Sequence, residues 1–162
     1  MSSARRLRVL GVPEQNAHMR MVWPDFHCQG RGRWIGKLRP FDFSESYDVR
    51  IEYRVGSRPK VWVVGLPARE EESESKKIPH RFADGSICLF YGDEWTADKP
   101  IARTIVPWLL EWLVFYEGWL VTGEWLGGGT HPTSRDEQGK PFDHSCADGQ
   151  ENPAKDDCAT QI

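Results

Sequence analysis

"YDVRIEYRV", residues 47–55, carries the clearest structural signal in the chain. Its side chains alternate between two kinds, with Tyr47, Val49, Ile51, Tyr53 and Val55 on one side and Asp48, Arg50, Glu52 and Arg54 on the other. A period of two predicts a β-strand with one buried and one solvent-exposed face, which is typical of antiparallel sheets.

The flanking segments extend this strand into a sheet. "RWIGKLRPF" (33–41) predicts a strand before it, "GSRP" (56–59) a turn, and "KVWVVGL" (60–66) the returning strand of a hairpin. Upstream, Pro13 suits the start of a short helix that ends before Pro24. The first part of the chain therefore predicts a short helix followed by an antiparallel meander.

Beyond residue 100 the period changes to that of a helix. One broad apolar face is formed by Ile101, Ile105, Trp108, Leu109, Trp112, Leu113 and Tyr116. Pro107 interrupts this pattern, and a proline inside a helix costs about 3 kcal/mol. Either one helix is kinked there, or a short first piece ends and a second helix begins at Pro107. Strands followed by a long helix predict the α+β class.

Two segments are too polar to join a core. "AREEESESKK" (68–77) predicts a solvated loop, because unpaired buried charges are costly. Residues 132–162 contain scattered Gly, Pro and Asp and almost no large apolar side chains, which predicts a disordered tail. We therefore expect one folded domain over 1–131 and a flexible tail over 132–162.

Composition limits the partners. A net charge of −3 argues against a nucleic-acid-binding protein. No apolar stretch follows the basic N-terminus, and "IVPWLLEWLVFY" (105–116) is too short and contains Glu111, so we expect neither a signal peptide nor a membrane span. The cysteines at 28, 88, 146 and 158 form no CxxC pair, which favours free thiols in the cytoplasm and no metal site.

The segment "GSICLFYGDEW" (85–95) poses the functional question. Free cysteine is among the most buried residue types, and Ile87 and Leu89 beside Cys88 suit a core strand. Cys88 also lies in an irregular segment between the sheet and the helix, where reactive groups are often placed. The residues alone leave both interpretations open.

A longer stretch resembles a known family. "PHRFADGSICLFYGDEW" (79–95), followed by "PIARTIVPWLLEWL" (100–113), is similar to the active-site region of ubiquitin-conjugating enzymes. The matching positions are His80, Gly85, Ile87, Cys88, Leu89 and Trp95. "EWLVFYEGWLVTGEWLGGGTHP" (111–132) resembles the bacterial branch found in anti-phage CBASS operons, which also encode a cGAS-like nucleotidyltransferase. The resemblance covers about residues 14–131.

The resemblance implies a fold and an activity. The fold would be a four-stranded antiparallel meander backed by a long helix. Cys88 would form a thioester with the C-terminus of a partner, the cGAS-like nucleotidyltransferase, and pass it to a lysine amine, thereby regulating antiviral cyclic-nucleotide signalling. His80 would assist at the catalytic site. The motif departs from the His-Pro-Asn of eukaryotic relatives, so the oxyanion donor is unassigned among His80, a backbone N–H and a later residue.

Other residues and other functions stay open. Asp93 and Glu94 are candidates to orient and deprotonate the incoming lysine, and His131 lies in a glycine-rich loop that could approach the site. No nucleotide-binding motif is present, so we expect no cofactor and an acyl donor that is activated elsewhere. A catalytically inactive adaptor is the main alternative, and a cysteine hydrolase is the weakest.

Overall fold

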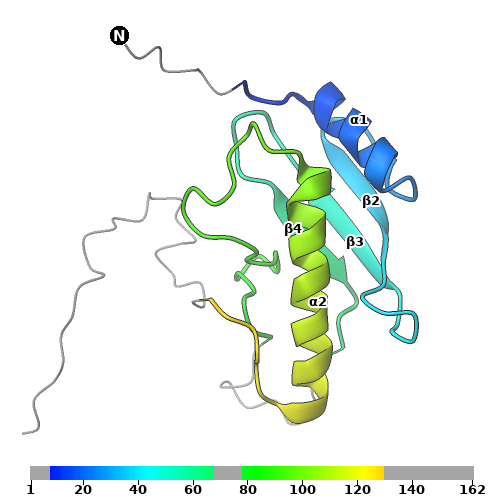
Figure 1. Cartoon of the computed structure of the whole chain (residues 1–162), viewed down its shortest axis with the longest axis vertical. Helices are drawn as coiled ribbons and strands as arrows, with labels where there is room; N and C mark the ends of the chain where they lie inside the picture. Colours follow the sequence, from blue (N-terminus) through cyan, green and yellow to red (C-terminus); the bar gives the residue numbers. More distant parts are fainter. Residues whose placement is uncertain (1–7, 68–77, 130–162) are drawn as a thin grey trace, which may run out of the picture.

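The computed structural model describes residues 8–67 and 78–129 (Figure 1). Its elements, in chain order, are α1 (Val12–Val22), β1 (His27–Cys28), β2 (Arg33–Leu38), β3 (Tyr47–Glu52), β4 (Lys60–Val64), the 3₁₀ helix η2 (Ile101–Arg103) and α2 (Ile105–Thr122). The strands form one antiparallel sheet in the order β1-β2-β3-β4. The predicted α+β fold is confirmed. The predicted loop at 68–77, the tail at 132–162 and His131 lie outside the described residues.

The strand that anchors the sheet has the predicted faces. In β3, Val49 and Ile51 are buried and pair with Val63 and Val61 of β4. The regular strand ends sooner than the alternation predicts, and Val55 is 58% exposed. The backbone turns there, since the Ser57 N–H donates to the Arg54 carbonyl at 2.9 Å.

Helix α2 covers the buried face of the sheet (Figure 1). Pro107 is the third residue of α2, in the first turn, where a helix needs no N–H donor. Of the two predicted alternatives, a short first piece followed by a second helix is therefore closer to the structure than one kinked helix. The short piece is η2, and α2 begins two residues before the proline. The helix runs through Gly118 and ends at Gly123, which has the left-handed φ of +80° that glycine tolerates.

Helix α1 holds the start of this helical region in place. The buried Gln15 side chain accepts the Ile101 N–H at 2.8 Å and donates to the Lys99 carbonyl at 3.1 Å. Trp23 Nε1 donates to the Ala102 carbonyl at 2.7 Å.

Over the described ranges, the structure contains no helix that is both long and apolar enough to cross a bilayer.

Candidate active site

The cysteine segment is attached to the free edge of the sheet at β4. The Ile87 N–H donates to the Val61 carbonyl at 2.8 Å, continuing the hydrogen bonding of that edge. Two β4 side chains also contact Asp84: Lys60 Nζ lies 2.7 Å from its carboxylate, and Trp62 Nε1 lies 3.2 Å from its carbonyl oxygen. The edge of β4, which would otherwise be open, thus fixes the position of the segment.

A tight backbone loop brings Cys88 beside His80. The Cys88 N–H donates to the His80 carbonyl at 2.7 Å, and the Phe82 N–H donates to the Ser86 carbonyl at 2.8 Å. Gly85 closes the turn with a φ of +80°, a conformation that residues other than glycine rarely adopt. The sequence motif is therefore a local structure, in which the glycine permits the turn that returns the chain to His80.

Asp84 stabilises this turn from within. Its carboxylate accepts hydrogen bonds from the Ser86 N–H at 2.9 Å and the Ser86 hydroxyl at 2.5 Å. Desolvation by burial alone would raise the pKa of Asp84, but the hydrogen bonds from Lys60 and Ser86 outweigh it and lower the pKa to about 2. Asp84 is therefore ionised at neutral pH and holds both the turn and the sheet edge.

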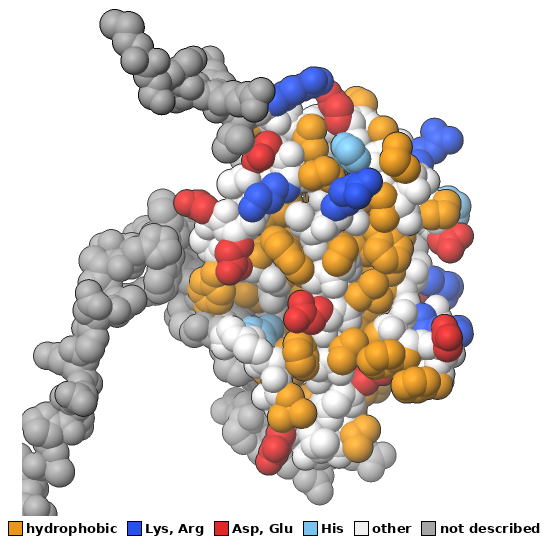
Figure 2. Space-filling view, viewed as in Figure 1, with side chains coloured by type: hydrophobic (Ala, Val, Ile, Leu, Met, Phe, Trp, Pro, Cys, Tyr) orange, Lys and Arg blue, Asp and Glu red, His pale blue; other side chains and the backbone are white. Residues whose placement is uncertain are grey.

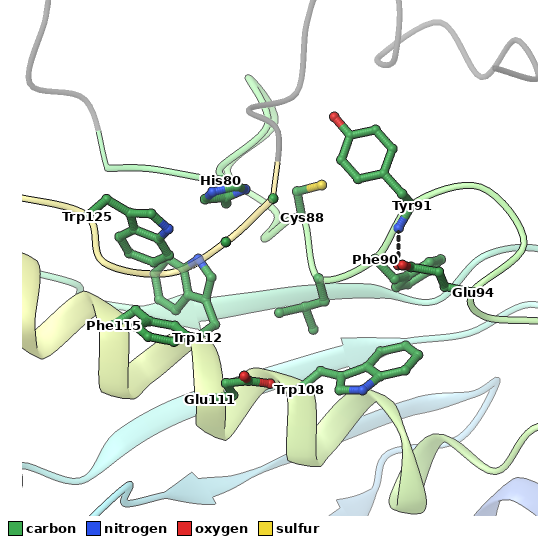
Figure 3. A pocket seen from close by; sticks show the side chains of 13 residues that line it. His80, Cys88, Phe90, Tyr91, Glu94, Trp108, Glu111, Trp112, Phe115 and Trp125 are labelled. Atoms are coloured by element: carbon green, nitrogen blue, oxygen red, sulfur yellow. Dashed lines mark hydrogen bonds between the residues drawn. The ribbon is translucent and has the colours of Figure 1, made fainter. Parts of the chain in front are cut away.

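Consecutive residues of the cysteine segment differ in where their side chains lie, some in the core and some in a pocket. Ser86 and Ile87 are buried at 3% and 5% exposure, whereas Cys88 is half-buried. Cys88 lines a pocket of about 540 Å³, within the usual size range of ligand sites (Figure 3). The position of the cysteine beside apolar residues is thus compatible with access, because Ile87 is buried in the core while Leu89 is only partly buried and lines the same pocket.

Aromatic rings form the walls of the pocket. Helix α2 contributes Trp108, Trp112 and Phe115, and the residues after α2 contribute Trp125. Trp125 lies 5.9 Å, centroid to centroid, from both Trp112 and Phe115, so the chain beyond α2 folds back onto the helix (Figure 3). Phe90 and Tyr91 border the pocket on the side of the cysteine segment. The result is an apolar groove that begins at the thiol and runs over α2.

His80 lies at the back of the groove. It is 6% exposed, its ring centroid is 5.2 Å from that of Trp125, and its φ is +53°, which is uncommon outside glycine. A methyl group at Gly129 would lie 3.2 Å from Cε1 of His80, so the backbone of the glycine-rich segment after α2 packs directly on the imidazole. Figure 3 shows that the Cys88 sulfur points away from the His80 ring, towards the side of Tyr91.

The structure separates the predicted acids. Glu94 lines the pocket and its carboxylate accepts the Tyr91 N–H at 2.7 Å. Asp93 is exposed and does not line the pocket. A third acid, Glu111 of α2, lines the groove and was not predicted. Its helical spacing to Trp108 and Phe115, at three and four residues, was a signal that places it on their face.

Of the other cysteines, the structure describes Cys28 alone. Cys28 is exposed in β1, and Cys146 and Cys158 lie outside the described residues. Within residues 8–67 and 78–129, no three His, Cys, Asp or Glu side chains lie close enough together to hold a metal ion.

Comparison with known protein families identifies a match. The family model described as "Type II CBASS E2 protein" matches residues 15–132, which include the sheet, the cysteine segment and α2. No curated protein matches the chain significantly.

Proposed function

Because the chain belongs to the family of type II CBASS E2 proteins and so has a role in CBASS antiviral systems, we propose that Cys88 is an acyl carrier. Its thiol would hold the C-terminal carboxyl group of a partner protein as a thioester and transfer it to an amine. The partner proposed here is the cGAS-like nucleotidyltransferase. The observation that carries the proposal is the half-buried thiol in the wall of a pocket of about 540 Å³.

The chemistry would proceed in two substitutions. In the first, the Cys88 thiolate attacks the activated C-terminal carbonyl, a thioester bond forms, and the activating group leaves. In the second, an amine attacks the new thioester, an amide forms, the Cys88 thiolate leaves, and a base takes the proton of the amine. A cysteine needs little activation for the first step when the donor is already a thioester, because the bond broken and the bond formed are alike. An ordinary accessible thiol is sufficient.

His80 suits a positioning role in this scheme. Its carbonyl fixes the Cys88 backbone through the 2.7 Å hydrogen bond, and its ring packs between Trp125 and Gly129. The Cys88 N–H is already donated to His80, so another group must stabilise the oxyanion of the tetrahedral intermediate. The direction of the sulfur, away from the imidazole, also gives no support to a cysteine–histidine hydrolase (Figure 3).

The groove has the composition to bind the end of a peptide. Its aromatic walls would bury the apolar part of an extended segment, since aromatic side chains bind large apolar surfaces. Among the described residues that line it, Glu94 and Glu111 carry negative charge and there is no Lys or Arg. Glu111 and Glu94, in place of Asp93, are therefore the acids that we propose to attract and deprotonate the incoming amine.

The decisive experiment is a test for the thioester. The chain is co-expressed with the nucleotidyltransferase, and adducts are measured by intact mass and on denaturing gels with and without reductant. We expect an adduct in the wild type that thiols release, a more stable oxyester in Cys88→Ser, and no adduct in Cys88→Ala. Cys28→Ala is the matched control, since it removes an exposed thiol away from the groove. Identical adduct levels in the wild type and Cys88→Ala would refute the proposal.

The same variants separate the carrier from an inactive adaptor. Cells that rely on the operon for phage resistance should lose it with Cys88→Ala if acyl transfer is required. Full protection by Cys88→Ala, together with unchanged binding to the partner, would instead support the adaptor.

Glu111→Gln tests the role of the acid in the second step. The isolated thioester should form normally and discharge more slowly to a lysine amine, by about 100-fold, which is the low end for general acid–base catalysis. Asp93→Asn, which changes an exposed acid outside the groove, should discharge at the wild-type rate.

A further inference from the structure

The loop between β2 and β3 displays two phenyl rings outside the core. Phe43 is 87% exposed and Phe41 is 41% exposed. The two rings lie parallel, 5.2 Å between centroids with an interplanar angle of 9°. Figure 2 shows hydrophobic side chains gathered at the lower right of this face, where the loop approaches the C-terminal half of α2. An aromatic pair in water is unfavourable unless something covers it.

Hydrogen bonds anchor the loop although its rings are exposed. The Ser44 N–H donates to the Phe41 carbonyl at 3.0 Å, closing a turn. Glu117 of α2 then fixes the end of the loop, accepting the Ser44 hydroxyl at 2.7 Å and the Tyr47 hydroxyl at 3.0 Å. A fixed aromatic pair loses little further entropy on association, which is the property of residues that dominate binding energy at interfaces.

This surface is on a different side of α2 from the groove. Glu117 follows Trp108, which lines the groove, by nine residues, which is two and a half turns at 3.6 residues per turn. It therefore lies on the opposite side of the helix. Val121, one turn beyond Glu117, is also exposed, at 83%. A protein bound to the two phenyl rings would leave the thiol and the groove accessible.

Charge indicates which kind of protein fits. Residues 37–48 contain the cations Lys37 and Arg39 and the acids Asp42, Glu45 and Asp48. Lys37 is paired with Asp48 at 2.8 Å, and Glu117 adds another carboxylate at the base of the loop. The surroundings of the rings are therefore acidic. A second copy of the chain is a poor fit, because its aromatic groove carries Glu94 and Glu111 and would repel them.

We propose that Phe41 and Phe43 are the docking site for the folded body of the acyl-donor protein, through an apolar depression on that protein bordered by Lys or Arg. The occupant rests on the proposed function, in which the donor is the nucleotidyltransferase. Its body would bind at the β2–β3 loop while its C-terminal segment reaches Cys88 around α2. Two separate contacts would then raise the local concentration of the tail at the thiol.

The test measures docking apart from chemistry. The full chain carrying Cys88→Ala is titrated with the full-length nucleotidyltransferase and, separately, with a synthetic peptide of its last ten residues. Phe43→Ser should weaken binding of the full-length protein about 10-fold or more and leave binding of the peptide unchanged. Glu45→Lys should weaken binding of the full-length protein several-fold, and this loss of affinity should become smaller at high salt. The matched control is Val55→Ser, which removes an exposed hydrophobic side chain at the other end of β3.

Other results either overturn the proposal or separate it from acyl transfer. Unchanged full-length binding by Phe43→Ser overturns it, and equal loss of peptide binding shows that the rings act at the groove. Self-association of the chain that Phe43→Ser abolishes, measured by light scattering, would make a second copy the occupant. If the wild type forms no adduct while Phe43→Ser still abolishes binding, acyl transfer fails and the docking site stands.

Discussion

The sheet and the cysteine segment both contribute buried residues to the core, but they differ in how their backbones are held. Strands β2, β3 and β4 are joined by continuous backbone ladders, with Ile51 of the central strand fully buried. Residues 78–100, all of which the structure describes, contain no strand and one isolated bridge, Arg81 with Ile87. Their position depends on contacts with β4, with α2 and with Trp125.

This difference indicates how the thiol is placed. A regular strand would bury alternate residues and present its backbone to neighbouring strands, whereas the irregular segment buries Ser86 and Ile87 in succession and leaves Cys88 in a groove. The sheet contributes fully buried side chains such as Ile51 to the core, and the segment uses the edge of that sheet as a support. Substitutions in the sheet should therefore change stability most, and substitutions around the segment should change reactivity most.

The largest stability effect is expected from Ile51→Ala. The side chain has no exposed surface, and truncating a buried isoleucine costs about 2–5 kcal/mol of unfolding free energy. Denaturant unfolding measures the loss. Val64→Ala, at a 61% exposed position of β4, should change stability by less than about 0.5 kcal/mol. A loss below 1 kcal/mol for Ile51→Ala would contradict the view that the sheet carries the stability.

An intermediate effect, mainly on reactivity, is expected from Trp125→Ala. The change removes ring contacts with His80, Trp112 and Phe115, at about 0.5–1.5 kcal/mol for each aromatic pair. It should also open the groove, so that iodoacetamide alkylates Cys88 several-fold faster in a chain whose other cysteines are replaced by alanine.

Trp125→Phe is the matched variant for this prediction. It keeps an aromatic ring at the same place, so its alkylation rate should stay near that of the wild type. Equal rates in Trp125→Ala and the wild type would show that this ring does not limit access to the thiol.

The smallest effect is expected from Asp84→Asn, which tests the link between the two regions. The folded-state pKa of Asp84, about 2, lies below its ordinary value of 3.8. The ionised carboxylate therefore adds stability above pH 4, and this contribution is lost as the pH falls through about 2. Because the pair with Lys60 is largely exposed, we expect a loss below about 1 kcal/mol at pH 7.

Thermal unfolding as a function of pH provides the measurement. The wild type and Asp84→Asn should differ at pH 5–7 and become equal towards pH 2. Lys37→Ala, which breaks an exposed ion pair on the open face of the sheet, serves as the comparison. A difference for Asp84→Asn that persists unchanged at pH 2 would mean that the effect does not come from the charge of the carboxylate.

Prediction from the sequence succeeded where the signal is local. The alternation in β3 predicted which of its residues are buried, and the spacing of Ile105, Leu109 and Tyr116 predicted the buried face of α2. It was less exact where a neighbour in space decides the outcome. Trp108 was assigned to that apolar face, yet it is only partly buried and lines the groove.

The candidate site was predictable only in part. Cys88 and His80 were predicted from the motif and Glu94 as an acid close to it, and all three line the pocket. Glu111 was missed because its neighbours in the sequence mark an apolar helix, and only the fold places it beside the cysteine segment. Asp93 was grouped with Glu94 as its immediate neighbour in the chain, but its side chain lies outside the groove.

The amino-acid sequence by itself determined the elements: a strand with two unlike faces, its partners, and a helix with one apolar side. It determined them because hydrophobic periodicity acts over a few residues and does not depend on distant contacts. Only the tertiary structure decided whether the sulfur of Cys88 faces the core or a groove. That choice depends on β4, α2 and Trp125, which are separated along the chain and meet only when burial of their apolar surfaces draws them together.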